Sequence, residues 1–355
     1  MCERAHESPS PGFMKLPVQE AVGTVLAHDI TEIRPGEFKG AAFHKGYVIR
    51  EEDVCHLQRL GKEHLFVLDI PEDELHEDEA AYALAVGLMG KGLTMKGKPR
   101  EGKIDIIAEQ DGLLKINKEA LLAFNMLGEV MCATLHNNRV VKKGQTVAGT
   151  RAIPLTVKKS IVQAAVSICW QAKSIIELKE IRKPKAGLVV TGNEVYHGRI
   201  KDAFAPVINR KIAEIGGEII GTHFAPDNES FIEAKLRELI NAGADLLITT
   251  GGMSVDPDDV TRFAIRNLGA SDITYGSAVL PGAMFLVAYV DAESAIPVLG
   301  IPACGMYAAT TIFDLILPRV LAGERIGRKE LAELGHGGLC MKCRTCNYPA
   351  CSFGK

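Results

Sequence analysis

The stretch TTGGMSVDPDDVT, residues 249–261, combines two glycines with three aspartates directly after the apolar segment ADLLI. Gly251 and Gly252 carry no side chain, so their backbone N–H groups can approach a bound anion closely. A carboxylate such as that of Asp259 repels a phosphate unless a cation such as Mg²⁺ lies between the two. The stretch therefore predicts a site for a phosphorylated ligand held together with a metal ion.

Candidate site residues also follow three other apolar segments in the same half of the chain. Glu194 follows AGLVV, Asp227 follows GEIIGTHF, and Pro302 follows IPVLG. Threonine and serine hydroxyls beside these ends can donate hydrogen bonds to a phosphate or to a pterin edge. The candidate ligand-binding residues are Thr191, Gly192, Thr249, Thr250, Gly251, Gly252, Ser254 and Pro302. The candidate acidic residues are Glu194, Asp227 and Asp259, with the two aspartates as Mg²⁺ ligands.

Each of these residues taken alone has a purely structural explanation. An aspartate in the first turn of a helix, the position expected for Asp259, is favoured by the helix dipole. Asp227 suits a turn, Glu194 suits a solvated loop, and a glycine pair suits a tight connection from strand to helix. A functional site is favoured because several segment ends would deliver these residues to one place.

The elements that must position these residues alternate between strand and helix from Lys185 onward. Continuous apolar segments such as AGLVVT and ADLLITT are typical of strands buried on both faces, and apolar residues recur at helical spacing between them. The pattern predicts an α/β fold with a mostly parallel sheet flanked by helices on both faces. Ligands of such sheets bind beyond the carboxyl ends of the strands, where the candidate residues would meet.

The chain is predicted to contain several further units. They are a flexible leader (1–13), an N-terminal domain (14–75), a β-rich middle module (76–182), the α/β domain (183–325) and a cysteine-rich tail (326–355). Within the middle module, Asp111-Gly112 predicts one β-hairpin and Lys143-Gly144 predicts a second. A helix through residues 170–181 is expected to end the module.

Composition restricts the possible classes of function. The 355 residues carry a formal net charge of −3, which argues against binding of nucleic acid or of an anionic membrane surface. The longest nearly apolar run, residues 80–90, is far shorter than the roughly 20 residues that cross a bilayer. The N-terminus lacks the apolar core of a secretory signal, and the nine cysteines are too unevenly placed for a disulfide framework. We therefore expect a cytoplasmic protein.

Four cysteines crowd into the last residues of the chain, in the segment GHGGLCMKCRTCNYPACSFGK. Cys340, Cys343, Cys346 and Cys351 follow the spacing C-x₂-C-x₂-C-x₄-C, which suits a tetrahedral Zn²⁺ or an iron–sulfur cluster. The close spacing of all four thiols favours the iron–sulfur cluster. A disordered, reduced tail is the alternative.

With these residues identified, the chain resembles the molybdopterin molybdenumtransferases, the group that includes the C-terminal domain of gephyrin. The resemblance covers residues 184–323 and is carried by TGNEV, APDN and, most specifically, DLLITTGGMSVDPDDVT. It implies that molybdate is handled by the acidic positions Glu194, Asp227 and Asp259, and that the turn with Gly251, Gly252 and Ser254 binds molybdopterin. It also implies a reaction in which molybdate enters the dithiolene of adenylated molybdopterin, with Mg²⁺, and AMP is released. The expected partners are molybdopterin, molybdate, a second copy of the chain and other cofactor-biosynthesis proteins.

This sequence departs from the family pattern at three places. Lys45 stands where such enzymes carry an aspartate, Ala283 stands in place of a lysine, and Cys304 stands in place of an asparagine. Loss of polar groups from an oxyanion-binding edge weakens polarisation of the ligand. Three hypotheses follow: a divergent molybdenumtransferase, a molybdopterin carrier or sensor without catalysis, and a nucleotide-processing enzyme that uses the same domain as competence-damage proteins.

Overall fold

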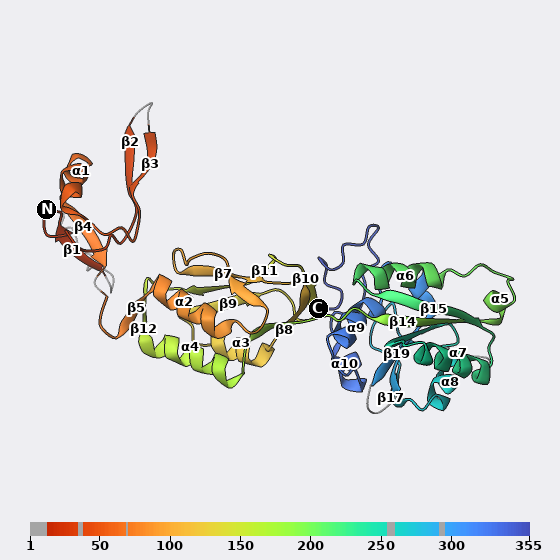
Figure 1. The fold of residues 1–355 in the computed structure, drawn as a ribbon. Coiled ribbons are helices and arrows are strands. Elements are labelled where there is room, and N and C mark those ends of the chain that lie inside the picture. Colours follow the sequence, from red (N-terminus) through yellow and green to blue (C-terminus); the bar gives the residue numbers. More distant parts are fainter. Residues whose placement is uncertain (1–12, 35–37, 69, 254–259, 291–294) are drawn as a thin grey trace.

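The computed structural model describes residues 13–34, 38–68, 70–253, 260–290 and 295–355, and Figure 1 shows three units lying one after another along the chain. The elements of the N-terminal unit are β1 (Phe13–Pro17), β2 (Ile30–Arg34), β3 (Phe38–Phe43), η1 (Glu51–Asp53), α1 (Val54–Arg59) and β4 (His64–Leu68). β1 pairs with β4 and β2 pairs with β3, both antiparallel. Leu26, Ile49 and Leu57 are buried in a core that belongs to this unit alone.

The middle module is β-rich, as predicted. Its elements are β5 (Glu74–His76), α2 (Glu77–Leu88), β6 (Leu93–Met95), β7 (Lys103–Ala108), β8 (Gly112–Ile116), α3 (Lys118–Asn125), β9 (Val130–Thr134), β10 (Arg139–Val141), β11 (Thr146–Ala152), β12 (Thr156–Lys158), α4 (Lys159–Gln171) and β13 (Ile176–Lys179). They form a four-stranded sheet in the order β6-β7-β11-β9, a three-stranded sheet in the order β10-β8-β13, and the pair β12-β5. The helices α2, α3 and α4 contribute buried side chains to a core shared with these sheets.

Both predicted hairpins were wrong, because the strands on either side of each turn belong to different sheets. The two connections contact each other instead. Asp111 accepts a hydrogen bond from the Lys143 backbone N–H at 2.9 Å and from Lys142 Nζ at 2.8 Å. The Gly144 N–H donates to the Ala108 carbonyl at 2.8 Å. These tertiary contacts, which a local turn signal does not contain, decide the strand pairing.

The predicted helix through residues 170–181 was also wrong. α4 ends at Gln171, and β13 follows it. Ile176 and Leu178 are both buried, and this alternation with more exposed residues is typical of a strand. The strand is stabilised by antiparallel pairing with β8, a partner far away in the sequence.

The third unit is the predicted α/β domain. Its elements are β14 (Lys185–Thr191), α5 (Asn193–Tyr196), α6 (Phe204–Glu214), β15 (Glu218–Ala225), α7 (Glu229–Asn241), β16 (Leu246–Thr250), α8 (Thr261–Asn267), β17 (Ser271–Tyr275), β18 (Leu286–Val290), β19 (Ile296–Ile301), η2 (Ala303–Met306), α9 (Ile312–Leu321) and α10 (Arg328–Glu333). The strand order is β15-β14-β16-β19-β18-β17. The first four strands are parallel, β18 pairs antiparallel with β19, and the edge strand β17 pairs antiparallel with β18. This arrangement confirms the predicted fold class.

Helices cover both faces of this sheet (Figure 1). Leu188 and Ile248 point to the face covered by α6 and α9, while Val189 and Leu247 point to the face covered by α7 and α8. Neighbouring residues of one strand thus enter two different cores, which explains why these strands are apolar throughout. No helix in the described part of the chain is long and apolar enough to cross a membrane.

The tail packs onto the α/β domain. Leu331 of α10 and Phe353 near the C-terminus are buried in the same core as α6 and α9. Leu280, which precedes β18, forms a parallel bridge with Leu339. Residues 326–355 therefore extend the core of the preceding domain.

Candidate functional site

The register of the sheet brings the carboxyl ends of four parallel strands to one edge. Thr191 at the end of β14 pairs with Ala225 at the end of β15, and Thr250 at the end of β16 pairs with Ile301 at the end of β19. Val190, one residue before the end of β14, pairs with Thr250. The segments that carry the predicted site residues therefore leave the sheet side by side.

Asp227 and the segment that carries Glu194 are in direct contact. The Asn193 backbone N–H donates to Asp227 Oδ2 at 2.9 Å, and the Asp227 backbone N–H donates to Asn193 Oδ1 at 3.3 Å. Glu194, the residue after Asn193, is exposed, while Asp227 is half-buried. These reciprocal bonds place both carboxylate-bearing segments together at neighbouring strand ends.

The two glycines after β16 occupy positions that exclude a side chain. Gly251 has φ +83°, and a Cβ there would lie 2.5 Å from the Thr191 carbonyl oxygen. Gly252 has φ +59°, and a Cβ there would lie 2.2 Å from Thr261 Oγ1. Only glycine combines a left-handed backbone with so close an approach, so the turn that follows β16 requires this pair.

The threonine hydroxyls differ in what they can offer a ligand. Thr191 Oγ1 donates to the Thr250 carbonyl at 3.0 Å and lies 3.2 Å from Thr261 Oγ1, so it holds two segments of the edge together. The hydroxyls of Thr249 and Thr250 are fully buried and have no hydrogen-bond partner among the described residues. A ligand reaches these two hydroxyls only if the residues that cover them move.

Of the remaining predicted positions, Gly192 and Pro302 lie within the described residues. Gly192 has φ +136°, and a Cβ there would lie 3.0 Å from Glu194 Oε1, so this glycine lets the Glu194 carboxylate fold back over the strand end. Pro302 is buried and is the N-cap residue of the short 3-10 helix η2 after β19. Ser254 and Asp259 lie outside the described residues.

The three departures from the family pattern have distinct surroundings. Lys45 forms an ion pair with Glu77 of α2, whose side chain is only 4% exposed, so its charge joins the N-terminal domain to the middle module. Ala283 is exposed and offers no cation. Cys304 is half-buried, and this burial raises the pKa of its thiol, which keeps the thiol neutral.

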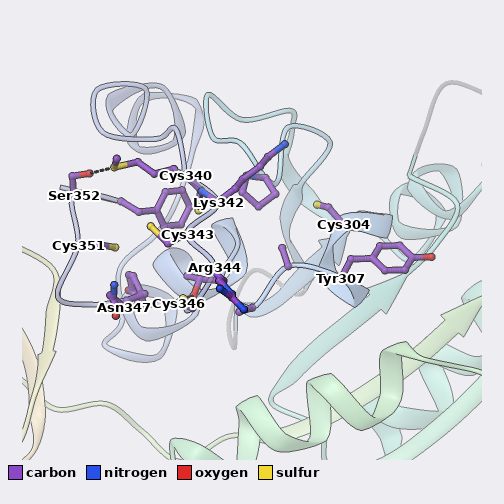
Figure 2. A pocket seen from close by; sticks show the side chains of 17 residues that line it. Cys304, Tyr307, Cys340, Lys342, Cys343, Arg344, Cys346, Asn347, Cys351 and Ser352 are labelled. Atoms are coloured by element: carbon purple, nitrogen blue, oxygen red, sulfur yellow. Dashed lines mark hydrogen bonds between the residues drawn. The ribbon is translucent and has the colours of Figure 1, made fainter.

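A cavity of about 450 Å³ lies between the tail and the segment that follows β19 (Figure 2). Cys340, Cys343, Cys346 and Cys351 line it from the tail, and their sharing of one metal centre remains a prediction. The sequence did not indicate the opposite wall, which includes Cys304. The cysteines of the described residues are all free, and no three described His, Cys, Asp or Glu side chains are placed to hold one metal ion.

The ion pair between Lys211 and Asp314 was also missed. Lys211 of α6 has a side chain that is 9% exposed, and it also donates to the Ala309 carbonyl at 3.0 Å. Asp314 accepts from the Thr311 backbone N–H at 2.7 Å and caps α9. The pair fixes the segment before α9, which forms part of the cavity wall. Its one sequence signal is a lysine beside Ile212 on the apolar face of α6.

Two family models match the chain. Residues 187–322 match the family described as "Probable molybdopterin binding domain", and residues 15–69 match a domain of unknown function. The α/β domain is therefore related to the molybdopterin-binding domains of molybdenum cofactor biosynthesis. The match covers this domain of the chain and supports the molybdopterin-binding domain family, not the molybdenumtransferases in particular.

Among curated proteins, a CinA-like protein of Mycobacterium avium is 43% identical over 89 residues, which cover 24% of this chain and 20% of that relative. A CinA-like protein of Mycobacterium tuberculosis is 39% identical over 93 residues, covering 25% of this chain and 22% of the relative. The matched segment thus spans about a fifth of the length of these relatives.

Among solved structures, the molybdopterin biosynthesis enzyme MoaB of Thermus thermophilus is 20% identical, with a TM-score of 0.34, and the match covers 40% of this chain and 98% of that one. A molybdenum cofactor biosynthesis protein of Pyrococcus furiosus is 14% identical, with a TM-score of 0.25, over 90% of this chain and 65% of that one.

Proposed function

We propose that this chain binds molybdopterin at the carboxyl edge of its parallel strands and serves molybdenum cofactor biosynthesis. The observation that carries the proposal is the bond from the Asn193 N–H to Asp227 Oδ2, at 2.9 Å, within the domain that matches the molybdopterin-binding family. It joins two segments whose polar residues follow neighbouring strands. The turn at Gly251 supports the same edge because bare backbone suits close approach to an anion.

The acidic residues of this edge fit a magnesium ion. Mg²⁺ prefers oxygen ligands, and it is commonly held by one or two carboxylates together with substrate phosphates. Asp227 is half-buried and Glu194 is exposed, so solvent reaches both residues. We assign Asp227 and Asp259 to the metal ion and Glu194 to molybdate. A bound Mg²⁺ would neutralise the phosphate charge that these carboxylates otherwise repel.

The finer activity that we propose is insertion of molybdate into the dithiolene of adenylated molybdopterin, with release of AMP. The chain's own contribution is to hold the two substrates next to each other, because fixed orientation lowers the barrier of a reaction between two molecules. Thr191 supports this role because its hydroxyl ties β14 to the residues around the glycine turn.

A carrier that binds molybdopterin without inserting molybdate is the second candidate. Three observations favour it. Ala283 supplies no donor where the transferases carry lysine, and the neutral Cys304 thiol is only a weak donor where they carry asparagine. Lys45 is engaged in its ion pair with Glu77. The cytoplasmic location and the homodimer are predictions under either candidate.

The two candidates are separated by measuring binding and turnover on the same preparation. Purified chain is mixed with adenylated molybdopterin, molybdate and Mg²⁺, and both bound pterin and released AMP are quantified. Asp227→Asn keeps an oxygen that can accept the Asn193 N–H but removes the charge, so we expect Mg²⁺-dependent binding to fall at least about tenfold. Glu218→Gln, at the exposed amino end of β15, is the matched control and should bind like the unmodified chain.

Binding with AMP release identifies the transferase, and binding without release identifies the carrier. Absence of pterin binding by the folded, unmodified chain would refute both candidates. Hydrolysis of a free nucleotide in the same assay, without pterin binding, would instead support the nucleotide-processing hypothesis.

A further inference from the structure

The tail forms a closed loop that is anchored at its base. The Gly354 N–H donates to the Gly337 carbonyl at 2.9 Å, so residues 338–353 leave and re-enter the domain at one point. Gly337 has φ +85°, and a Cβ there would lie 2.2 Å from the Lys355 carbonyl oxygen, so glycine is required at this crossing. Compact surface loops with neighbouring ends are frequently functional.

Three further contacts hold this loop against the α/β domain. The Leu280 N–H donates to the Gly338 carbonyl at 2.8 Å, and the Cys340 N–H donates to the Leu280 carbonyl at 2.8 Å. Phe353 is buried in the domain core, with Tyr348 packed edge-to-face against it at 6.3 Å between ring centroids. The loop contains no helix or strand, so these contacts fix its course.

Four thiols of this loop line one cavity of about 450 Å³ (Figure 2). Cys340 and Cys351 are half-buried and pack against the domain core, whereas Cys343 and Cys346 are exposed. Cys304 contributes a fifth thiol from the far wall, and Figure 2 draws it apart from the tail cysteines.

The surroundings of these thiols suit thiolates. Thr310 Oγ1 lies 3.3 Å from Cys346 Sγ, and the Lys342 N–H donates to Cys340 Sγ at 3.5 Å. Lys342 and Arg344 line the same cavity and supply positive charge for an anionic thiolate centre.

We propose that the loop 338–353 binds an iron–sulfur cluster through Cys340, Cys343, Cys346 and Cys351. A single tetrahedral Zn²⁺ has Zn–S bonds of about 2.3 Å, which brings its thiolate sulfurs to roughly 3.8 Å from one another. No three metal-liganding side chains in the described ranges converge in this way. Instead the thiols surround a cavity, and a cluster fills such a space with its own iron and sulfide. Hydrogen bonds to the sulfurs are also a feature of protein-bound clusters.

The cluster site lies next to the proposed ligand edge but does not depend on it. The cavity wall opposite the tail includes Cys304 and Thr310, in the segment that follows β19. This segment begins at Pro302, at the edge where the parallel strands end. The cluster and a ligand at the strand ends would therefore contact opposite parts of one short segment.

The test uses the full-length chain, purified without oxygen and incubated with ferric iron, sulfide and a thiol reductant, so that the added iron supplies the ferric ions of a cluster. We expect iron and acid-labile sulfide in equal amounts, with the visible absorption of a cluster. Cys343→Ser and Cys346→Ser should each lose this iron and sulfide, and because both cysteines are exposed, the fold should be retained. Circular dichroism of each variant checks that the fold is retained.

Two serine variants serve as matched controls. Cys55→Ser, an exposed cysteine of the N-terminal domain, and Cys304→Ser, across the cavity, should keep the cluster. Purified chain that holds one zinc ion and no sulfide would overturn the proposal, as would a folded chain that takes up no iron. Loss of the cluster in Cys304→Ser would refute the assignment of the four ligands. None of these outcomes depends on molybdopterin binding.

Discussion

Replacement of Gly251 by alanine tests whether the strand ends of the α/β domain are as closely packed as the structure indicates. Alanine in a left-handed conformation costs about 1–2 kcal/mol. At Gly251 the new Cβ would in addition lie 2.5 Å from the Thr191 carbonyl oxygen. This atom belongs to the backbone of β14 and cannot rotate away, and forcing a methyl group into a packed position costs about 1–3 kcal/mol more.

Gly243 provides the matched control within the same domain. It follows α7 with φ +94°, and a Cβ there would meet nothing within 4 Å. Gly243→Ala should therefore cost only the conformational strain of about 1–2 kcal/mol, whereas Gly251→Ala should cost about 2–5 kcal/mol. The difference isolates the close approach of the glycine turn to Thr191.

Hydrogen exchange of peptides from β14 and β16 is the appropriate measurement. The one tryptophan, Trp170, is 77% exposed in the middle module, so its fluorescence does not report on this edge. Exchange also avoids the assumption that a chain of several units unfolds in one step. Gly251→Ala should speed exchange of β16 by roughly 5- to 150-fold relative to Gly243→Ala. Equal exchange in the two variants would show that the turn does not approach Thr191, and the proposed geometry of the edge would fail.

Two further predictions concern the wall of the cysteine-lined cavity. Lys211→Met leaves the Asp314 carboxylate without its cation, and breaking a mostly buried pair costs about 3–5 kcal/mol. The midpoint temperature of thermal unfolding of the α/β domain should therefore fall clearly. An unchanged midpoint would contradict a structural role of the pair. Thr310→Val removes the hydroxyl that lowers the pKa of Cys346, so in the metal-free chain the pH midpoint of Cys346 alkylation should rise. Alkylation of Cys343 provides the internal control. A midpoint for Cys346 that does not move would contradict the hydrogen bond to Thr310.

The α/β domain was predictable because its signals are local in the sequence. Strands such as β14 and β16 carry apolar residues on both faces, and each is followed by a segment with apolar residues at helical spacing. The gathering of Glu194 and Asp227 also followed from a general rule, since parallel strands deliver their carboxyl ends to one edge. The bonds between Asn193 and Asp227 agree with that reasoning.

The middle module was harder to predict because its pairings connect distant segments. Asp111-Gly112 has the composition of a hairpin turn, yet Asp111 bonds to Lys143 in another connection. A turn signal describes four residues, whereas the partner of a strand is decided by burial of a face against the rest of the core. The same reason explains why residues 176–179 form a strand that pairs with β8.

For this protein, the amino-acid sequence determined the alternating elements of the α/β domain, the acidic and glycine residues at its strand ends, and the four-cysteine spacing of the tail. Periodicity and spacing along the chain are sufficient for these features, because each depends on residues close together in sequence. Tertiary structure decided that Cys304 and Thr310 face the tail cysteines, and that Lys211 pairs with Asp314 beneath them. The contacts across the cavity arise only when the closed loop 338–353 packs against the segment after β19, and the ion pair arises only when α6 packs beside α9. Both therefore depend on side chains from distant parts of the chain.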